Sequence, residues 1–158
     1  MNIKKYYEIF ADYHQFYLMD AEQTPRAPED WTKDDVQRRI KADKYIVVIQ
    51  PERNTTVPVE LEILDGASKE NFENWDHIAE ASLELPSGKL QIGECCGETK
   101  DVLFLPSGSY KVRAFYGNLD ALSFDGLNGD DHYKIVMWQA SLEDVKVVKQ
   151  YKNGRGFE

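Results

Sequence analysis

The chain has 158 residues and a mass of 18.3 kDa, the size of one ordinary domain. We therefore expect a single domain over residues 1–158, with a core over about residues 4–151 and a flexible tail at residues 153–158. The 28 acidic and 19 basic residues give a formal charge of −9. This balance argues against direct binding of nucleic acids, because a protein that neutralises phosphates needs a basic face. It is compatible with a basic protein partner.

Membrane insertion is not expected, because no stretch of about 18 apolar residues occurs in the sequence. The first residues also lack the apolar run of a signal peptide. The two cysteines, Cys95 and Cys96, are adjacent, and neighbouring residues on a strand point to opposite faces, so a bridge between them would be strained. These features favour a cytoplasmic protein with reduced thiols. They leave open whether the chain forms a homo-oligomer.

Alternation of hydrophobic and polar residues dominates the chain and predicts short β-strands. Residues 4–19 are rich in tyrosine and phenylalanine and predict one long bent strand or two short ones, with a break near Asp12. Residues 20–31 contain two prolines and no periodic pattern, which predicts a loop.

One short helix is predicted over about residues 33–41. Thr32 is a good N-cap, because its hydroxyl can accept a hydrogen bond from the first turn. Asp34 and Asp35 follow in that turn, where the helix dipole favours anions. Val36 and Ile40 lie four residues apart and give a narrow apolar stripe.

The remaining strands are predicted over residues 45–50, 56–64, 76–85, 89–95, 101–105, 109–117, 132–139 and 145–151. Pro58 suggests that the strand containing it starts at a sheet edge or a bulge. Two similar turns, Leu85–Lys89 and Leu105–Ser109, share the order Leu-Pro-Ser-Gly and predict tight hairpins between the strands that flank them. Nine or ten short strands with one helix predict a mostly β fold, an antiparallel β-sandwich.

The sequence contains no pattern that is typical of a catalytic or cofactor site. The histidines His14, His77 and His132 have no metal-ligand spacing with the cysteines, and no phosphate-binding loop or nucleophile elbow occurs. A Cys–His nucleophile would use Cys95 or Cys96, but nothing in the sequence marks a base or an oxyanion site. We therefore expect neither an enzyme nor a bound cofactor.

The segment from Phe124 to Asp131 is rich in glycine and in oxygen-bearing side chains. Asp125, Asn128, Asp130 and Asp131 could ligate calcium, although their spacing is not that of an EF-hand. The alternative is a solvated loop without a metal.

Acidic residues gather in three stretches of the chain, at residues 20–35, 60–84 and 117–131. The second stretch holds eight acids against one lysine, and the third holds four acids and no base. Solvated faces explain such clusters, and so does a surface that imitates phosphates for the groove of a basic protein.

Four blocks of the sequence together resemble the competence protein J (ComJ) family. The blocks are Tyr13-His14-Gln15-Phe16, Asp30-Trp31-Thr32, Arg53-Asn54-Thr55 and Leu105-Pro106-Ser107-Gly108-Ser109-Tyr110, and their order and spacing agree over about residues 5–140. The family comprises inhibitors of the nuclease that acts as DNA enters the cell. The resemblance therefore implies an acidic inhibitor that blocks the DNA-binding groove of a basic nuclease. The chain departs from the family at residues 65–80, at residues 118–131 and beyond residue 140.

We expect a set of partner-binding residues that combines members of these blocks with the two acids of the adjacent helix start: Asp30, Trp31, Arg53, Asn54 and His14 from the blocks, and Asp34 and Asp35 from the helix start. Exposed aromatic side chains such as Trp31, Phe72 or Trp75 would supply the contact area. Each block also has a purely structural interpretation, as a helix start, a turn or a sheet segment. The alternative function is a ligand-binding or calcium-binding β-sandwich module.

Overall fold

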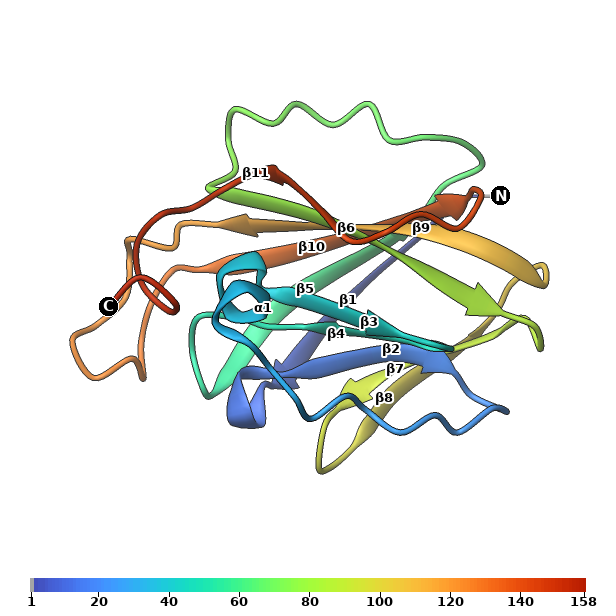
Figure 1. Ribbon diagram of the computed structural model, residues 1–158, viewed down its shortest axis with the longest axis horizontal. Helices are drawn as coiled ribbons and strands as arrows, with labels where there is room; N and C mark the ends of the chain where they lie inside the picture. The colour runs from blue at the N-terminus through green and yellow to red at the C-terminus, as the bar shows by residue number, and fades with distance from the viewer. Residues whose placement is uncertain (1) are drawn as a thin grey trace.

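The computed structural model of the protein, which describes residues 2–158, consists of two packed β-sheets and one α-helix (Figure 1). The strands in chain order are β1 (Ile3–Phe10), β2 (Phe16–Asp20), β3 (Ile40–Asp43), β4 (Ile46–Ile49), β5 (Thr56–Ile63), β6 (His77–Leu85), β7 (Lys89–Glu94), β8 (Thr99–Phe104), β9 (Gly108–Gly117), β10 (His132–Gln139) and β11 (Lys146–Lys149). The helical elements are the 3-10 turn η1 (Asp12–His14) and the helix α1 (Lys33–Arg38).

The six-stranded sheet has the order β1-β5-β10-β9-β6-β11, and the five-stranded sheet has the order β3-β4-β2-β7-β8. Eight of the nine strand pairs formed by residues 2–158 are antiparallel, and only β5 and β10 run parallel. The predicted mostly β sandwich with one short helix is thus confirmed. Strand alternation fills the core as expected: Val57, Val59, Leu61 and Ile63 of β5 are all buried between the sheets.

The break predicted near Asp12 is the point at which the chain passes from one sheet to the other. β1 pairs with β5 in the six-stranded sheet, whereas β2 pairs with β4 and β7 in the five-stranded sheet. Between them, Tyr13 and His14 adopt positive φ angles of 56° and 58° in η1. Left-handed backbone turns the chain within a few residues, so the tyrosine-rich segment forms two strands.

The helix is shorter than the predicted range of residues 33–41. Thr32 caps it as predicted, and Asp35 completes a capping box by accepting a hydrogen bond from the Thr32 amide at 2.9 Å. The helix ends after Arg38 because Arg39 adopts a left-handed conformation with φ 61°. Residues 40–43 then form β3, whose first two residues fall within the predicted helix range.

The two Leu-Pro-Ser-Gly turns are not hairpins, and this prediction is wrong. β6 pairs with β9, and β7 pairs with β8, so each turn carries the chain from one sheet to the other. The segment from β6 to β9 is one long antiparallel ribbon that is folded over at both turns. The two turns lie side by side, since the Leu105 amide donates to the Gly88 carbonyl at 2.7 Å. Proline and glycine signal a sharp change of direction, but they do not show which strands pair afterwards.

Pro58 lies in an interior strand, because β5 is flanked by β1 and β10. The proline is tolerated there because it faces Glu8 of β1, while the pairing with β10 begins only at Val59. At Pro58 itself, the strand therefore has one partner, and no ladder hydrogen bond to β10 is lost.

A buried polar network fills the end of the sandwich at which α1, the loop after β9 and the C-terminal segment meet, here called the helix end (Figure 1). At its centre, the Arg39 guanidinium is fully buried and its Nε donates to Glu52 Oε1 at 2.5 Å. Its remaining nitrogens donate to the backbone carbonyls of Gln37, Tyr151, Asn153 and Arg155. Because a buried charge is costly unless it is fully paired, this side chain fixes the segments around it.

Residues 153–158, where the sequence predicted a flexible tail, fold back onto this network. The Arg155 amide donates to Glu52 at 3.3 Å, and the Gln37 side chain donates to the Gly156 carbonyl at 2.7 Å. The Phe157 ring lies 6.0 Å from the Arg39 guanidinium. The tail thus provides acceptors that Arg39 would otherwise lack.

His77 links the chain just before the tail to the end of the helix. Its Nδ1 accepts a hydrogen bond from the Tyr151 amide at 3.1 Å, so the proton lies on Nε2, which donates to the Arg38 carbonyl at 2.7 Å. Burial lowers the pKa of His77 to about 4, and the nearby Arg39 charge acts in the same direction. The ring is therefore neutral at pH 7.

The contact between the two turns gives a first prediction. Gly88 has φ +72°, and a Cβ there would overlap the Leu105 carbonyl oxygen. We expect Gly88→Ala to lower the free energy of unfolding by at least about 2 kcal/mol. Gly66→Ala is the matched control, because Gly66 has no heavy atom within 4 Å of the added methyl, and it should cost less than about 0.5 kcal/mol. Urea unfolding measures the free energy of unfolding of both variants. If both lose the same amount, the contact between the two turns does not stabilise the fold.

The buried neutral His77 gives a second prediction. Its pKa is about 4 when folded and about 6.5 when unfolded, so the unfolded chain binds the extra proton between these values. Stability should be complete above pH 6.5 and fall by about 3 kcal/mol from this group as the pH drops to 4. In His77→Gln, that part of the pH dependence should vanish, although the variant is less stable at every pH. Urea unfolding at several pH values tests this. The prediction is refuted if the free energy of unfolding depends on pH as strongly in the variant as in the wild type.

Candidate protein-binding surface

Three of the four blocks that resemble the ComJ family meet at the helix end. Tyr13 and His14 lie in η1, Trp31 precedes α1, and Asn54 lies in the loop between β4 and β5. The fourth block forms the second of the two folded turns at the opposite end, where the Tyr110 hydroxyl donates to the Pro106 carbonyl at 2.6 Å. That hydrogen bond lies within the second turn, whereas the other three blocks contribute residues to the surface at the helix end.

Three of the residues proposed for partner binding are free to make contacts. Asp30, Asp34 and Asn54 are exposed. Asp34 has no ion-pair partner among residues 2–158. Lys41 Nζ lies 3.8 Å from the Asp30 carboxylate and donates a hydrogen bond to the Asp30 backbone carbonyl at 3.1 Å. Their side chains therefore present charge and hydrogen-bonding groups to solvent at the helix end.

Asp35 and Arg53 instead form ion pairs with other residues of the protein. Asp35 caps α1 and forms ion pairs with Arg38 at 3.0 Å and Lys41 at 2.6 Å. These hydrogen bonds lower the pKa of Asp35 against the effect of burial. Arg53 is buried and pairs with Asp131 at 2.6 Å. The sequence showed the charges of both residues but not their burial, because that depends on contacts distant in the chain.

His14 and Trp31 are half-buried. His14 Nδ1 lies 3.3 Å from the Pro51 carbonyl, and burial together with the Arg155 charge lowers the pKa of this histidine. Trp31 packs beside Lys41, whose Nζ lies 5.9 Å from the ring centroid, and the indole Nε1 has no hydrogen-bond partner among residues 2–158. An indole N–H usually finds a partner when it is buried.

A groove of about 630 Å³ on the outer face of the five-stranded sheet brings two of the blocks together. Tyr13 lines it from η1, Gln15 from the position just before β2, and Trp31 from the loop that precedes α1. Tyr13 is 67% exposed, so an aromatic ring stands at the rim. The groove thus brings together Tyr13, Gln15 and Trp31, which belong to two of the blocks that carry the resemblance.

Cys95 and Cys96 line the far side of the same groove, in the turn between β7 and β8 rather than on a strand. Their sulfur atoms are 3.1 Å apart and not bonded to each other, and both thiols are free. Burial and the neighbouring Cys96 raise the pKa of Cys95 to about 12. A thiol that stays protonated near neutral pH is a poor nucleophile, which argues against Cys95 in that role.

The four oxygen-bearing residues proposed as a calcium alternative do not assemble into a site. Asp131 is buried, and its carboxylate accepts hydrogen bonds from Arg53 at 2.6 Å and from Tyr133 at 2.5 Å. Asp125 accepts one hydrogen bond from the Ser123 hydroxyl and one from the Leu127 amide within its own turn. Across residues 2–158, no group of three or more histidine, cysteine or acidic side chains is placed to hold a metal ion.

Phe72 and Trp75, which we expected to be exposed contact residues, belong instead to a cluster on the outer face of the six-stranded sheet. Trp75 packs against Phe115 with ring centroids 5.3 Å apart, and Arg113 lies over the Phe72 ring at 5.2 Å. The loop that contains them covers this face because the outward residues of β9 and β10 are hydrophobic.

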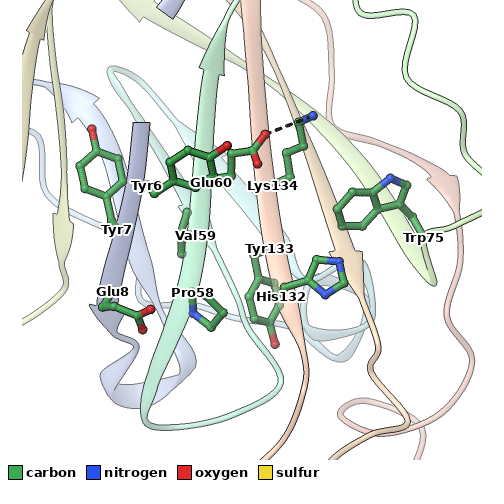
Figure 2. Close-up of a pocket in the computed structure, with 10 residues that line it drawn as sticks. All are labelled: Tyr6, Tyr7, Glu8, Pro58, Val59, Glu60, Trp75, His132, Tyr133 and Lys134. Atoms are coloured by element: carbon green, nitrogen blue, oxygen red, sulfur yellow. Dashed lines mark ion pairs between the residues drawn. The ribbon is translucent and has the colours of Figure 1, made fainter. Parts of the chain in front are cut away.

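Beside that cluster, a hollow of about 340 Å³ opens on the outer face of β1, β5 and β10 (Figure 2). Pro58 and Val59 line it from β5, and Tyr6 and Glu8 line it from β1. Figure 2 shows His132 beside Trp75, whose ring centroids are 5.0 Å apart. The hollow is lined mainly by apolar and aromatic groups, and its Lys134 is neutralised by Glu60 at 3.2 Å.

The sequence did not predict that hydrophobic side chains are exposed at the helix end. Phe124 and Leu127 project from the loop after β9, whose glycines and oxygen-bearing side chains predict a calcium-binding or solvated loop but no hydrophobic contact site. Their position between aspartates and glycines was visible, but exposure cannot be read from a segment without periodicity. Within residues 2–158, no helix is long and apolar enough to cross a membrane.

No family model matches the sequence, and comparison with curated protein sequences gives no match. Among solved structures, the chain is similar to ComJ from Bacillus subtilis, an inhibitor of the DNA-degrading activity of NucA. The TM-score is 0.71 and the identity 19%, over 89% of this chain and 99% of that chain. It is also similar to a protein described as crocagin biosynthetic gene J, with a TM-score of 0.56 and 18% identity over 89% of this chain and 98% of that one. The resemblance to the ComJ family is thus confirmed at the level of the fold.

Proposed function

We propose that the protein is an inhibitor of a nuclease and that its helix end blocks the basic DNA-binding groove of that enzyme. The observation that carries the proposal is the fold, which is similar to that of ComJ over 89% of this chain. The inhibitor acts by binding, without a cofactor and without catalysis of its own.

The charge distribution supports a basic partner. The formal charge of −9 favours encounter with a positively charged protein. Asp30, next to Trp31 in the chain, and Asp34, in the first turn of α1, are both exposed. A nuclease groove that binds phosphates offers the lysines and arginines that such carboxylates would pair with. Tyr13 and Trp31 add aromatic contact area next to the acids.

The alternative is a ligand-binding module, for which the hollow in Figure 2 is the specific observation. Its aromatic and apolar lining is typical of small-molecule sites, and its volume lies at the lower limit for them. It lies on the outer face of the six-stranded sheet, away from the Trp31 groove on the opposite sheet. A Tyr6→Ala variant that inhibits a nuclease normally would separate this hollow from the inhibitory function.

The proposed function is tested by a DNA-degradation assay. The purified chain is titrated into NucA and into the nuclease encoded beside its gene, with DNA cleavage as the readout. We expect stoichiometric inhibition of at least one enzyme. Failure to inhibit either nuclease would contradict the proposal.

Charge steering gives a third prediction. In the double variant Asp30→Lys/Asp34→Lys, we expect the association rate with the inhibited nuclease to fall on the order of tenfold at low salt, while dissociation changes little. Added salt should likewise slow association of the wild-type protein far more than it speeds dissociation, because screening acts over about 8–10 Å. Asp35 is left unchanged, since reversing it would remove the cap of α1.

The matched control is Asp43→Lys/Asp144→Lys, which changes the net charge equally. Asp43 and Asp144 are exposed together at the opposite end of the sandwich, beside the turn between β3 and β4. If both double variants slow association to the same extent, net charge alone steers the complex and the helix end has no special part. Stopped-flow fluorescence or surface plasmon resonance measures the rates.

A further inference from the structure

The loop between β9 and β10 is a small preformed hairpin. Leu122 and Gly129 form an isolated antiparallel bridge. The Ser123 amide donates to the Asn128 carbonyl at 2.7 Å, and the Asp130 amide donates to the Ala121 carbonyl at 2.9 Å. A segment that the sequence predicts as a solvated loop thus has its own strand-like pairing, and we call residues 118–131 the acidic hairpin.

The tip of the acidic hairpin is held by its own polar groups. Asp125 Oδ1 accepts hydrogen bonds from the Ser123 hydroxyl at 2.6 Å and from the Leu127 amide at 3.0 Å. The Ser123 hydroxyl in turn accepts from the Asn128 amide at 3.0 Å. Gly126, with φ +73°, allows the tight turn between them. These bonds fix the backbone of the tip before any partner binds.

The base of the acidic hairpin is fixed to the core by the Arg53–Asp131 ion pair. Arg53 also donates to the Leu127 carbonyl at 3.2 Å, so one buried side chain holds both the base and the tip. On the other side, the Asn118 side chain donates to the Asp130 carbonyl at 3.2 Å. The hairpin is therefore a positioned element and not a free loop.

This rigid element exposes two large hydrophobic side chains. Phe124 is fully exposed, with a relative accessibility of 109%, and Leu127 is 59% exposed. Exposing a phenylalanine at the tip of a braced turn gains nothing for folding, since a polar residue would be solvated better there. Large side chains on a preorganised backbone are what a protein-binding anchor needs, because little conformational entropy is lost when they bind.

The charges beside these side chains identify the kind of partner. The acidic hairpin contains Asp120, Asp125, Asp130 and Asp131 and no lysine or arginine. Asp131 is neutralised by Arg53, whereas Asp125 and Asp130 remain exposed. A second copy of the same hairpin or an anionic membrane would be repelled. A concave basic surface with an apolar pocket matches both the charge and the shape.

We propose that the acidic hairpin is the anchor of the complex and inserts Phe124 into an apolar pocket within the basic groove of the nuclease. The inference rests on the proposed function and adds the element that holds the partner. Asp125 and Asp130 pair with basic groups at the rim of that pocket, and Leu127 packs against its wall. Arg53 is a positioning residue, because it holds the hairpin without reaching the partner.

The test compares Phe124→Ala with the matched control Phe104→Ala. Phe104 is 73% exposed on β8, outside the acidic hairpin. The inhibition constants of the full-length variants are measured against NucA and against the nuclease encoded beside the gene. We expect Phe124→Ala to weaken inhibition by about 30-fold or more through faster dissociation, and Phe104→Ala by less than about threefold. Thermal unfolding should be unchanged in both variants, because neither side chain packs inside the protein.

The outcomes separate this inference from the proposed function. If the wild-type chain inhibits neither nuclease, the proposed function fails and the anchor fails with it. If the wild type inhibits and both alanine variants inhibit equally well, the function stands and the acidic hairpin is not the anchor. Sedimentation of the wild type alone is the second measurement. A dimer that Phe124→Ala dissociates would show that a second copy occupies the tip, which would also overturn the inference.

Discussion

The buried guanidinium of Arg39 is the constraint on which the helix end depends. The backbone of Arg39 is left-handed and ends α1, and β3 begins at the next residue. The same residue therefore sets both the length of the helix and the start of the strand. The charge needs five hydrogen bonds, and four of the acceptors are backbone carbonyls of residues 37 and 151–155. Because an unpaired buried charge costs several kcal/mol, the C-terminal segment must fold back to supply these acceptors. Helix, tail and the Glu52 loop are thereby one unit.

A second buried pair, Arg53 with Asp131, fixes the neighbouring hairpin in the same way. The two arginines differ in what they hold: Arg39 closes the end of the sandwich, while Arg53 positions a loop that projects from it. Each is matched by a buried acid, Glu52 or Asp131, so both cations are neutralised inside the protein. The carboxylates of Asp30, Asp34, Asp125 and Asp130 are not used in this way and remain at the surface. Burial thus decides which of the acids are available to a partner.

The sequence predicted strands well because a two-residue period records burial on one face directly. The alternating run in β5 and the cap at Thr32 were visible for that reason. The folded turns at Gly88 and Ser107 were misread, since proline and glycine report a bend but not the sheet that the chain enters afterwards. The arrangement of the candidate binding surface was harder to predict than the turns. Arg53 and Asp131 lie 78 residues apart in the chain, and no local pattern shows that they pair.

Two kinds of exposed side chain at the helix end contribute to binding in different ways. Exposed carboxylates act at a distance and raise the frequency of encounter, but each contributes little once water and salt surround the pair. Hydrophobic side chains act only on contact, and they decide how long the complex lasts. The helix end places both kinds on one rigid frame, with Asp34 at the start of α1 and Phe124 at the tip of the acidic hairpin. Since the buried arginines fix that frame, the hairpin tip can change in sequence without disturbing the sheets, which is how loops on a constant scaffold acquire different partners.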